Sequence, residues 1–295
     1  MKFIQVLLYA LLVSLLQAEE VVEENVTQEQ YEQMLVEFEN SLNKQEGSIT
    51  LSGGLVELEI PEGYYFLDAE DSKKVLEELW GNPPSSSEVQ GMIFPSSYSI
   101  TNDAVWGVTV EYSDEGHVKD KDASKIDYED LLADMQSDTL AASKARVEMG
   151  YEAIELVGWA SEPYYDETSK KLHWAKNIRF GTAEENTLNY NIRVLGREGY
   201  LLMNFIANMS QLEEINEVRD DVLAMAHFTE GNTYADFDPK LDNVAAYGIG
   251  GLVAGKVLAK TGILAKILLA TKKIWIVLVV AVGSFIKRAL GRSDK

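Results

Sequence analysis

The amino-acid sequence predicts an α+β fold, a mainly antiparallel sheet with helices packed on it, followed by a C-terminal membrane helix. Three observations lead to this prediction. Segments with apolar residues at every second position are interleaved with segments of helical periodicity. The last three predicted strands are separated by short glycine-containing turns, which join antiparallel neighbours. Near the end of the chain, the uncharged block 274–286 has lysine or arginine on both sides.

The chain of 295 residues is expected to begin with an export signal. Lys2 precedes the apolar stretch 3–16, and the small residue Ala18 precedes the acidic Glu19. Residues 1–18 are therefore predicted to be a signal peptide that is cleaved after Ala18. The alternative is an N-terminal anchor that is not cleaved.

Residues 19–46 are predicted to form an acidic leader with one helix. Thr27 and Gln30 have the spacing of a capping box. Apolar residues then recur at helical spacing in a single stripe: Tyr31, Met34, Leu35, Phe38 and Leu42. We expect the stripe to dock on the main domain; the alternative is that it recruits a partner.

The main domain is predicted over residues 47–228. Gly53-Gly54 lies between two alternating segments and predicts a hairpin with a two-residue loop. Asp68 is expected to cap the first helix of the domain, and Gly81 to end it. The other predicted elements of this half are four strands, at 49–51, 56–60, 89–94 and 106–112, and a helix at 128–149.

The second half of the domain is predicted to be a meander of four strands, at 151–160, 172–180, 188–196 and 200–209. The last of them is apolar on both faces, because Leu201, Met203 and Phe205 alternate with Leu202 and Ile206. We therefore expect it to be central, with helices covering both sides. Ser210 and Glu213 predict a capping box that opens the final helix, and residues 229–243 are expected to be a linker.

Residues 244–270 are predicted to form a glycine-rich, basic amphipathic helix. Its small face carries Gly250, Gly251 and Gly255, and the last two have the GxxxG spacing that lets helices approach closely. Lysines occupy another face, which suits the membrane surface. We expect this helix to lie at the interface or to pack in a bundle; the alternative is a second membrane span.

Residues 271–290 are predicted to be a transmembrane helix, and residues 291–295 a cytoplasmic tail. The 13 uncharged residues of the block 274–286 are short for a bilayer, but the flanking lysines can extend toward the headgroups. The alternative is that the block forms a buried core helix.

The formal net charge of −22 is unevenly divided along the chain. After residue 243 there are nine basic residues and one acidic residue, a net charge of +8, which leaves −30 for the preceding part. This acidic part argues against nucleic acid as a partner, whereas the basic tail is attracted to a lipid bilayer. Together with export, the tail predicts a single-pass membrane protein whose folded domain is extracytoplasmic (periplasmic). The chain has no cysteine, so disulfides and thiol chemistry are excluded.

Seven short motifs point to a known family, among them LEELWGNPP (76–84) and GMIFP (91–95); the others lie at 118–123, 158–160, 173–176, 188–197 and 245–251. They resemble an uncharacterised bacterial family, the domain of unknown function 2167, which is described as membrane-anchored. The resemblance extends over residues 45–290 and implies an envelope protein without an assigned activity. The order of elements is also similar to that of Mog1/PsbP-like domains.

The sequence contains no recognised catalytic motif: no G-x-S-x-G, no H-E-x-x-H and no P-loop. Asp120 and Asp122 begin like a calcium loop, but Lys125 stands where that loop needs glycine. The acidic residues of the segment 229–243 are expected to be solvated, although Asp236, Asp238 and Asp242 could touch calcium. The sequence therefore predicts no catalytic residue, cofactor or metal site.

A candidate ligand-binding set lies in the meander: Lys176, Asn189, Asn191, Arg193 and Arg197. Lys176 sits among apolar residues of its strand, where a charge needs a partner or a wet cavity. Two amides and an arginine follow on one face of the next strand, and Arg197 lies at its turn. Such a row can bind a carboxylate or a glycan. The alternative is a solvated face or buried structural hydrogen bonds.

The predicted function is a membrane-anchored envelope protein that acts as a non-catalytic binding or interaction module. Its expected partners are the lipid bilayer and, through the glycine-rich helix, a membrane protein or a second copy of the chain. One alternative is an envelope hydrolase that uses carboxylates such as Asp120, Asp122 or Asp166 as acid or base. Another is a subunit of a membrane assembly.

Overall fold

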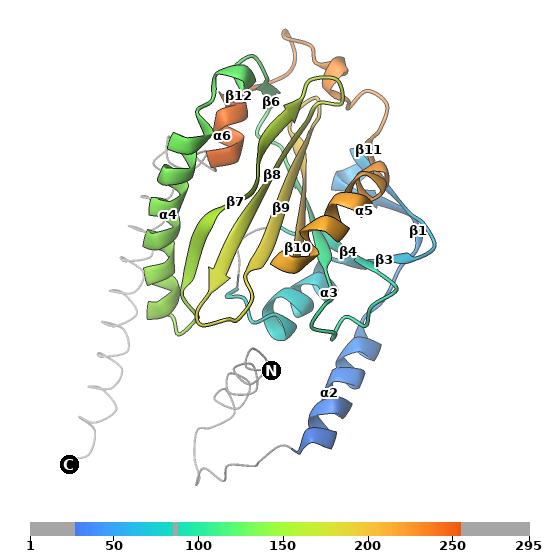
Figure 1. The fold of residues 1–295 in the computed structure, drawn as a ribbon. Helices are drawn as coiled ribbons and strands as arrows, with labels where there is room; N and C mark the ends of the chain where they lie inside the picture. The colour runs from blue at the N-terminus through green and yellow to red at the C-terminus, as the bar shows by residue number, and fades with distance from the viewer. Residues whose placement is uncertain (1–26, 85–87, 255–295) are drawn as a thin grey trace, which may run out of the picture. The chain divides into compact units, whose positions relative to one another are not determined.

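The computed structural model describes residues 27–84 and 88–254, and a seven-stranded sheet forms its centre (Figure 1). The strand order is β3-β4-β5-β10-β9-β8-β7, and all neighbours are antiparallel. The strands are β3 (Tyr64–Asp68), β4 (Gly91–Pro95), β5 (Gly107–Ser113), β7 (Ile154–Asp166), β8 (Lys171–Phe180), β9 (Thr187–Leu195) and β10 (Tyr200–Asn208). The predicted α+β class with a mainly antiparallel sheet is confirmed.

Two smaller sheets accompany the central one. One has the order β1-β2-β11, and the other pairs β6 with β12 in parallel. Their strands are β1 (Gly47–Leu51), β2 (Val56–Ile60), β6 (His117–Lys119), β11 (Ala226–Phe228) and β12 (Val244–Gly248). The predicted two-residue loop between β1 and β2 is wrong: the helical turn Ser52–Gly54 and Leu55 connect them, since Gly53 adopts a φ of 67° there.

The helices are α2 (Gln28–Ser41), α3 (Ala69–Lys73), α4 (Tyr128–Glu148), α5 (Leu212–Ala224) and α6 (Ile249–Ala254); α3 continues into a π-helical turn, Lys74–Leu79. The predicted caps at Thr27 and Asp68 are confirmed. The box predicted at Ser210 and Glu213 is wrong. Asn208 and Gln211 form it instead, because a 3-10 turn over Met209–Gln211 precedes α5.

The main core lies between the central sheet and a layer made of α5 and the β1-β2-β11 sheet. Figure 1 shows α5 across the face of the sheet and α4 beside β7. The predicted central position of β10 is confirmed, since it lies between β5 and β9. Phe205 of β10 is fully buried, and its ring lies 5.8 Å from that of Trp106 and 6.3 Å from that of Tyr190.

A second core cluster lies on the opposite face of β3 and β4, where α3 packs. It is formed by side chains that alternate with those of the main core: Tyr65, Leu67, Met92 and Phe94. The last turn of α2 reaches this cluster through Phe38 and Leu42, whereas Met34 is 47 % exposed. The apolar stripe of the leader therefore docks at its C-terminal end.

The segment predicted as the linker 229–243 is packed against the domain. Arg197 and Asp242 tie it to the β9–β10 turn, and Tyr234 donates a hydrogen bond to the carbonyl oxygen of Val118 at 3.0 Å. The predicted start of a helix at residue 244 is wrong. Val244–Gly248 pairs with β6 as a strand, so the helix begins at Ile249.

Gly250 and Gly251 lie in α6, whereas Gly255 lies outside the described residues. The same is true of the rest of the predicted helix 244–270, the transmembrane helix 271–290, the tail 291–295 and the signal peptide 1–18. Within the part of the chain that is described, no helix has the length and apolar character needed to cross a membrane.

Candidate functional site

Four of the five predicted ligand-binding residues meet on the face of the sheet opposite α5. Lys176 pairs across the strands with Asn189, and Asn191 and Arg193 follow on the same side of β9. Their neighbours in sequence point into the main core instead. We call this side the cationic face, and it consists of Trp174, Lys176, Asn189, Asn191 and Arg193.

The amides of the cationic face bond to each other. The Asn191 amide nitrogen donates to the Asn189 side-chain oxygen and to its carbonyl oxygen, both at 2.9 Å. The Arg193 guanidinium lies over the Trp174 ring, 4.8 Å from its centroid, and 5.8 Å from that of Tyr200. Stacking of this kind orients the planar guanidinium without neutralising its charge.

Several polar groups of this region lack a partner among the described residues. Lys176 has neither a hydrogen bond nor an ion pair there. Three buried atoms are also without a hydrogen bond: Arg193 Nε, Trp174 Nε1 and Asn204 Oδ1. Asn204 lies opposite Asn191 on β10. Buried polar atoms normally have partners, so this concentration calls for an explanation.

Electrostatics at the cationic face disfavour the charged forms of both cations. Burial, together with the positive charge of Arg193, lowers the pKa of Lys176 to about 8. Burial likewise lowers the pKa of Arg193 to about 10, against the opposing effect of Tyr200 and Glu111. Two half-buried cations thus lie on one face, with the Trp174–Asn191 pair between them in the β8–β9 register.

Arg197 is not part of this face. Its guanidinium donates twice to the Asp242 carboxylate, with both distances 2.8 Å, and once to the carbonyl oxygen of Gly231. The hydrogen bonds from Arg197 and from the Asp238 amide lower the pKa of Asp242 to about 2. Arg197 therefore holds the 229–243 segment in place and does not complete the ligand-binding row.

The carboxylates considered for a hydrolase also have structural contacts. Asp120 accepts hydrogen bonds from Tyr165 and Lys170, at 2.9 and 2.7 Å. Asp122 accepts from the Ile249 amide, and Asp166 accepts from the β7–β8 turn. No group of three metal-ligating side chains occurs among residues 27–84 and 88–254.

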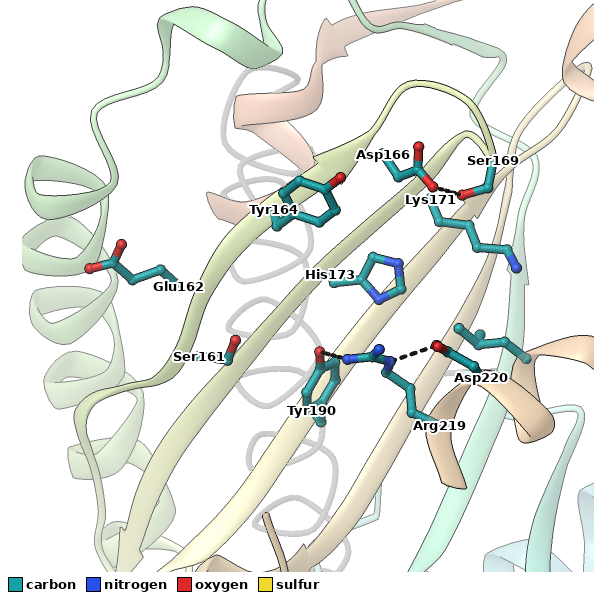
Figure 2. Close-up of a pocket in the computed structure, with 11 residues that line it drawn as sticks. Ser161, Glu162, Tyr164, Asp166, Ser169, Lys171, His173, Tyr190, Arg219 and Asp220 are labelled. Atoms are coloured by element: carbon teal, nitrogen blue, oxygen red, sulfur yellow. Dashed lines mark hydrogen bonds and ion pairs between the residues drawn. The ribbon is translucent and has the colours of Figure 1, made fainter. Parts of the chain in front are cut away.

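The other face of the sheet carries a cavity of about 450 Å³ between β7, β8, β9 and α5 (Figure 2). We call it the His173 pocket. It is lined by side chains of the strands and of α5, namely Ser161, Glu162, Tyr164, Asp166, Ser169, Lys171, His173, Tyr190, Arg219, Asp220 and Leu223. Tyr164 and His173 are direct neighbours in the β7–β8 register.

The polar groups of the His173 pocket are held by defined contacts. Arg219 donates to the Tyr190 hydroxyl and to Asp220, both at 2.9 Å. Burial, helped by Arg219 and Lys171, lowers the pKa of His173 to about 4, so the imidazole is neutral at physiological pH. Its Nδ1 atom is buried and has no hydrogen-bond partner among the described residues.

The chain matches the family described as "Protein of unknown function (DUF2167)" over residues 43–283. It belongs to this family. The match confirms the family resemblance drawn from the sequence motifs. No curated protein matches the chain.

Two solved structures are similar to the DUF2167 chain in fold. PsbP of the cyanobacterium Synechocystis has 12 % identity, and the alignment covers 64 % of this chain and 94 % of that one, with a TM-score of 0.36. The Ran-binding protein Mog1p of Saccharomyces cerevisiae has 10 % identity, with coverage of 63 % and 96 % and a TM-score of 0.31. The fold class of this chain rests on the strand order given above.

Sequence reasoning found the cationic face of the DUF2167 domain but missed the His173 pocket. Alternation along β9 predicts that Asn189, Asn191 and Arg193 share one side, and the β8–β9 register adds Lys176 to that side. The pocket instead combines side chains from four elements. Only the β7–β8 register and the position of α5 bring Tyr164, His173 and Arg219 together.

Proposed function

We propose that this DUF2167 protein is a non-catalytic binding module that holds an anionic group, a carboxylate or a phosphate, on its cationic face. We further propose that residues 271–290 anchor it in a bacterial membrane with the folded domain outside the cytoplasm. The observation that carries the binding proposal is the pair Lys176 and Arg193, two half-buried cations of which Lys176 has no partner among the described residues.

Charge compensation favours an anion at the cationic face. A charge removed from water is costly unless an opposite charge or hydrogen bonds replace the lost solvation. Arg193 is stacked on Trp174, so its fork of N–H groups is oriented in advance, and its Nε–H has no acceptor among the described residues. Lys176 adds a second positive charge across the strands. An anion bound between them would satisfy both groups.

The acidic residues favour binding over hydrolysis, because they are engaged in structural hydrogen bonds. Asp120 is bonded to Lys170 and Tyr165, and Asp166 to Ser169 within a turn. A carboxylate engaged in this way is not poised to act as an acid or base on a ligand at the cationic face. The amides Asn189 and Asn191 add orientation to the site without adding a reactive group.

Removal of the Lys176 charge is expected to weaken anion binding about 10- to 100-fold, since a hydrogen bond to a charged group contributes that much. The measurement is calorimetric titration of the full-length protein in a zwitterionic detergent, with succinate and inorganic phosphate as probes and Lys176→Met as the variant. Affinity is also expected to fall as the pH rises above about 8, where Lys176 loses its proton.

Lys144→Met is the matched control, because Lys144 is an exposed lysine of α4. It should bind both probes as the parent does. Failure of both anions to bind the parent would overturn the proposal. Equal affinities in Lys176→Met and the parent would do the same, because they would place any anion elsewhere.

The membrane arrangement is proposed to be a single span, with residues 291–295 in the cytoplasm. Two spans would carry the basic tail outward, against the positive-inside tendency. They would also place Lys256 and Lys260 in the bilayer, at about 2.5–3.5 kcal/mol each. The glycine-rich segment with Gly250, Gly251 and Gly255 then remains available to a membrane-protein partner or a second copy.

The position of the tail can be measured in this cysteine-free chain with the substitution Ser293→Cys. We expect a membrane-impermeant maleimide to label the full-length protein only after the cells are permeabilised. A cysteine at the exposed Ser169 of the β7–β8 turn serves as the control and should be labelled from outside. Immediate labelling of Ser293→Cys would mean a second span.

A further inference from the structure

The His173 pocket lies on the opposite side of the sheet from the cationic face. His173 and Lys176 belong to the same strand, but three positions separate them, so their side chains leave β8 on opposite faces. Tyr190, which also lines the pocket, alternates with Asn189 and Asn191 in the same way. A ligand of this pocket would therefore be independent of an anion on the cationic face.

The pocket presents donors and acceptors at fixed positions without a dominant charge. Lys171 and Arg219 contribute positive charge, and Glu162, Asp166 and Asp220 contribute negative charge. The neutral His173 ring lies between them, with its buried Nδ1 free of hydrogen bonds to the described residues (Figure 2). An anion would meet nearby carboxylates, whereas a neutral ligand with several hydroxyl groups can use both kinds of partner.

One wall of the pocket is an aromatic side chain that the fold leaves uncovered. Tyr164 is 63 % exposed, whereas Tyr65, Tyr190 and Tyr200 are all buried. Its ring centroid lies 6.5 Å from that of His173. An exposed aromatic face beside a polar cavity offers apolar contact to one side of a ligand and hydrogen bonds to its edge.

We infer that the His173 pocket binds a neutral saccharide, whose ring lies against Tyr164 and whose hydroxyl groups bond to His173, Arg219 and Asp220. A sugar ring has an apolar face of C–H groups and a rim of hydroxyls, which matches this division of the pocket. The cavity of about 450 Å³ also falls within the range of about 300–1,000 Å³ typical of small-molecule sites. Arg219 is held by Tyr190 and Asp220, so the hydrogen-bonding groups are positioned before a ligand arrives.

The test is saturation-transfer NMR on the full-length protein in a detergent without a sugar headgroup. The probes are glucose, N-acetylglucosamine and cellobiose. We expect signal transfer to at least one of them, and about a 10-fold loss of affinity in Tyr164→Ala, because the aromatic contact is removed. Tyr164→Phe keeps the ring and should keep most of the affinity. Affinity should also be constant from about pH 5.5 to 7.5, because His173 stays neutral there.

Val157→Ala is the matched control, since Val157 is an exposed residue of the same strand that does not line the pocket. It should bind like the parent. The absence of transfer to all three sugars would overturn the inference, as would equal binding by Tyr164→Ala and the parent. Loss of sugar binding in Lys176→Met would assign the sugar to the cationic face and would also overturn it, whereas the anion titration is a separate readout.

Discussion

Replacing Phe205 by aspartate is expected to abolish folding of the domain. Phe205 is fully buried in the central strand, between the rings of Trp106 and Tyr190. Its loss would leave a large cavity, and the new carboxylate would have no cation to pair with among the neighbouring core residues. We expect a loss of more than about 4 kcal/mol, which is a large part of the stability of a typical domain.

The measurement is the thermal melt of the full-length protein, followed by circular dichroism. Val157→Asp is the control: it introduces the same charge at an exposed position of the edge strand β7 and should melt close to the parent. A Phe205→Asp variant that unfolds at the parent's temperature would contradict the central position of β10 and the burial of its Phe205 side chain.

Gly199→Ala is expected to be the second strongly destabilising change. The Cβ of an alanine would clash with the carbonyl oxygen of Ser113, and the next contacts are also backbone atoms. Tyr200 pairs with Ser113 where β10 and β5 meet, so neither chain can move away without breaking the ladder. We expect a loss of at least about 2 kcal/mol, as for overpacking in a tight site.

The control for this prediction is Gly158→Ala. A Cβ at Gly158 would meet no atom within 4 Å, and the residue lies in β7 where the pairing with β8 shifts register. Its effect should stay within about 1 kcal/mol in either direction. Urea unfolding followed by tryptophan fluorescence compares both variants with the parent. Equal midpoints for Gly199→Ala and the parent would mean that the β9–β10 turn can rearrange.

The two proposed binding sites lie on opposite sides of one sheet and depend on different properties of their side chains. The cationic face depends on two charges that the fold half-buries, and the His173 pocket depends on a balanced set of polar groups beside an uncovered ring. Anion affinity should therefore change with pH near the lowered pKa of Lys176, about 8, whereas sugar affinity should not. This difference separates the two sites in a single preparation.

Local sequence patterns were sufficient for six of the seven strands of the central sheet, all except β3. Period-two alternation identified β8, β9 and β10, and it placed Asn191 and Arg193 on one face of β9, because successive side chains of a strand alternate. The β8–β9 register then brought Lys176 to the same face. Short turns predicted antiparallel pairing of these strands. The caps at Thr27 and Asp68 were also predictable, since a capping side chain bonds to amides only two or three residues away.

The tertiary structure decided what depends on distant segments. β3 and β11 were not predicted, because β3 is apolar at consecutive positions and β11 has only three residues, so pairing partners define them. The acidic composition of the 229–243 segment predicts a linker, yet Arg197 fixes the segment through Asp242. The His173 pocket follows the same rule: periodicity gives the face on which a side chain lies, but only strand register and helix packing decide which side chains meet there.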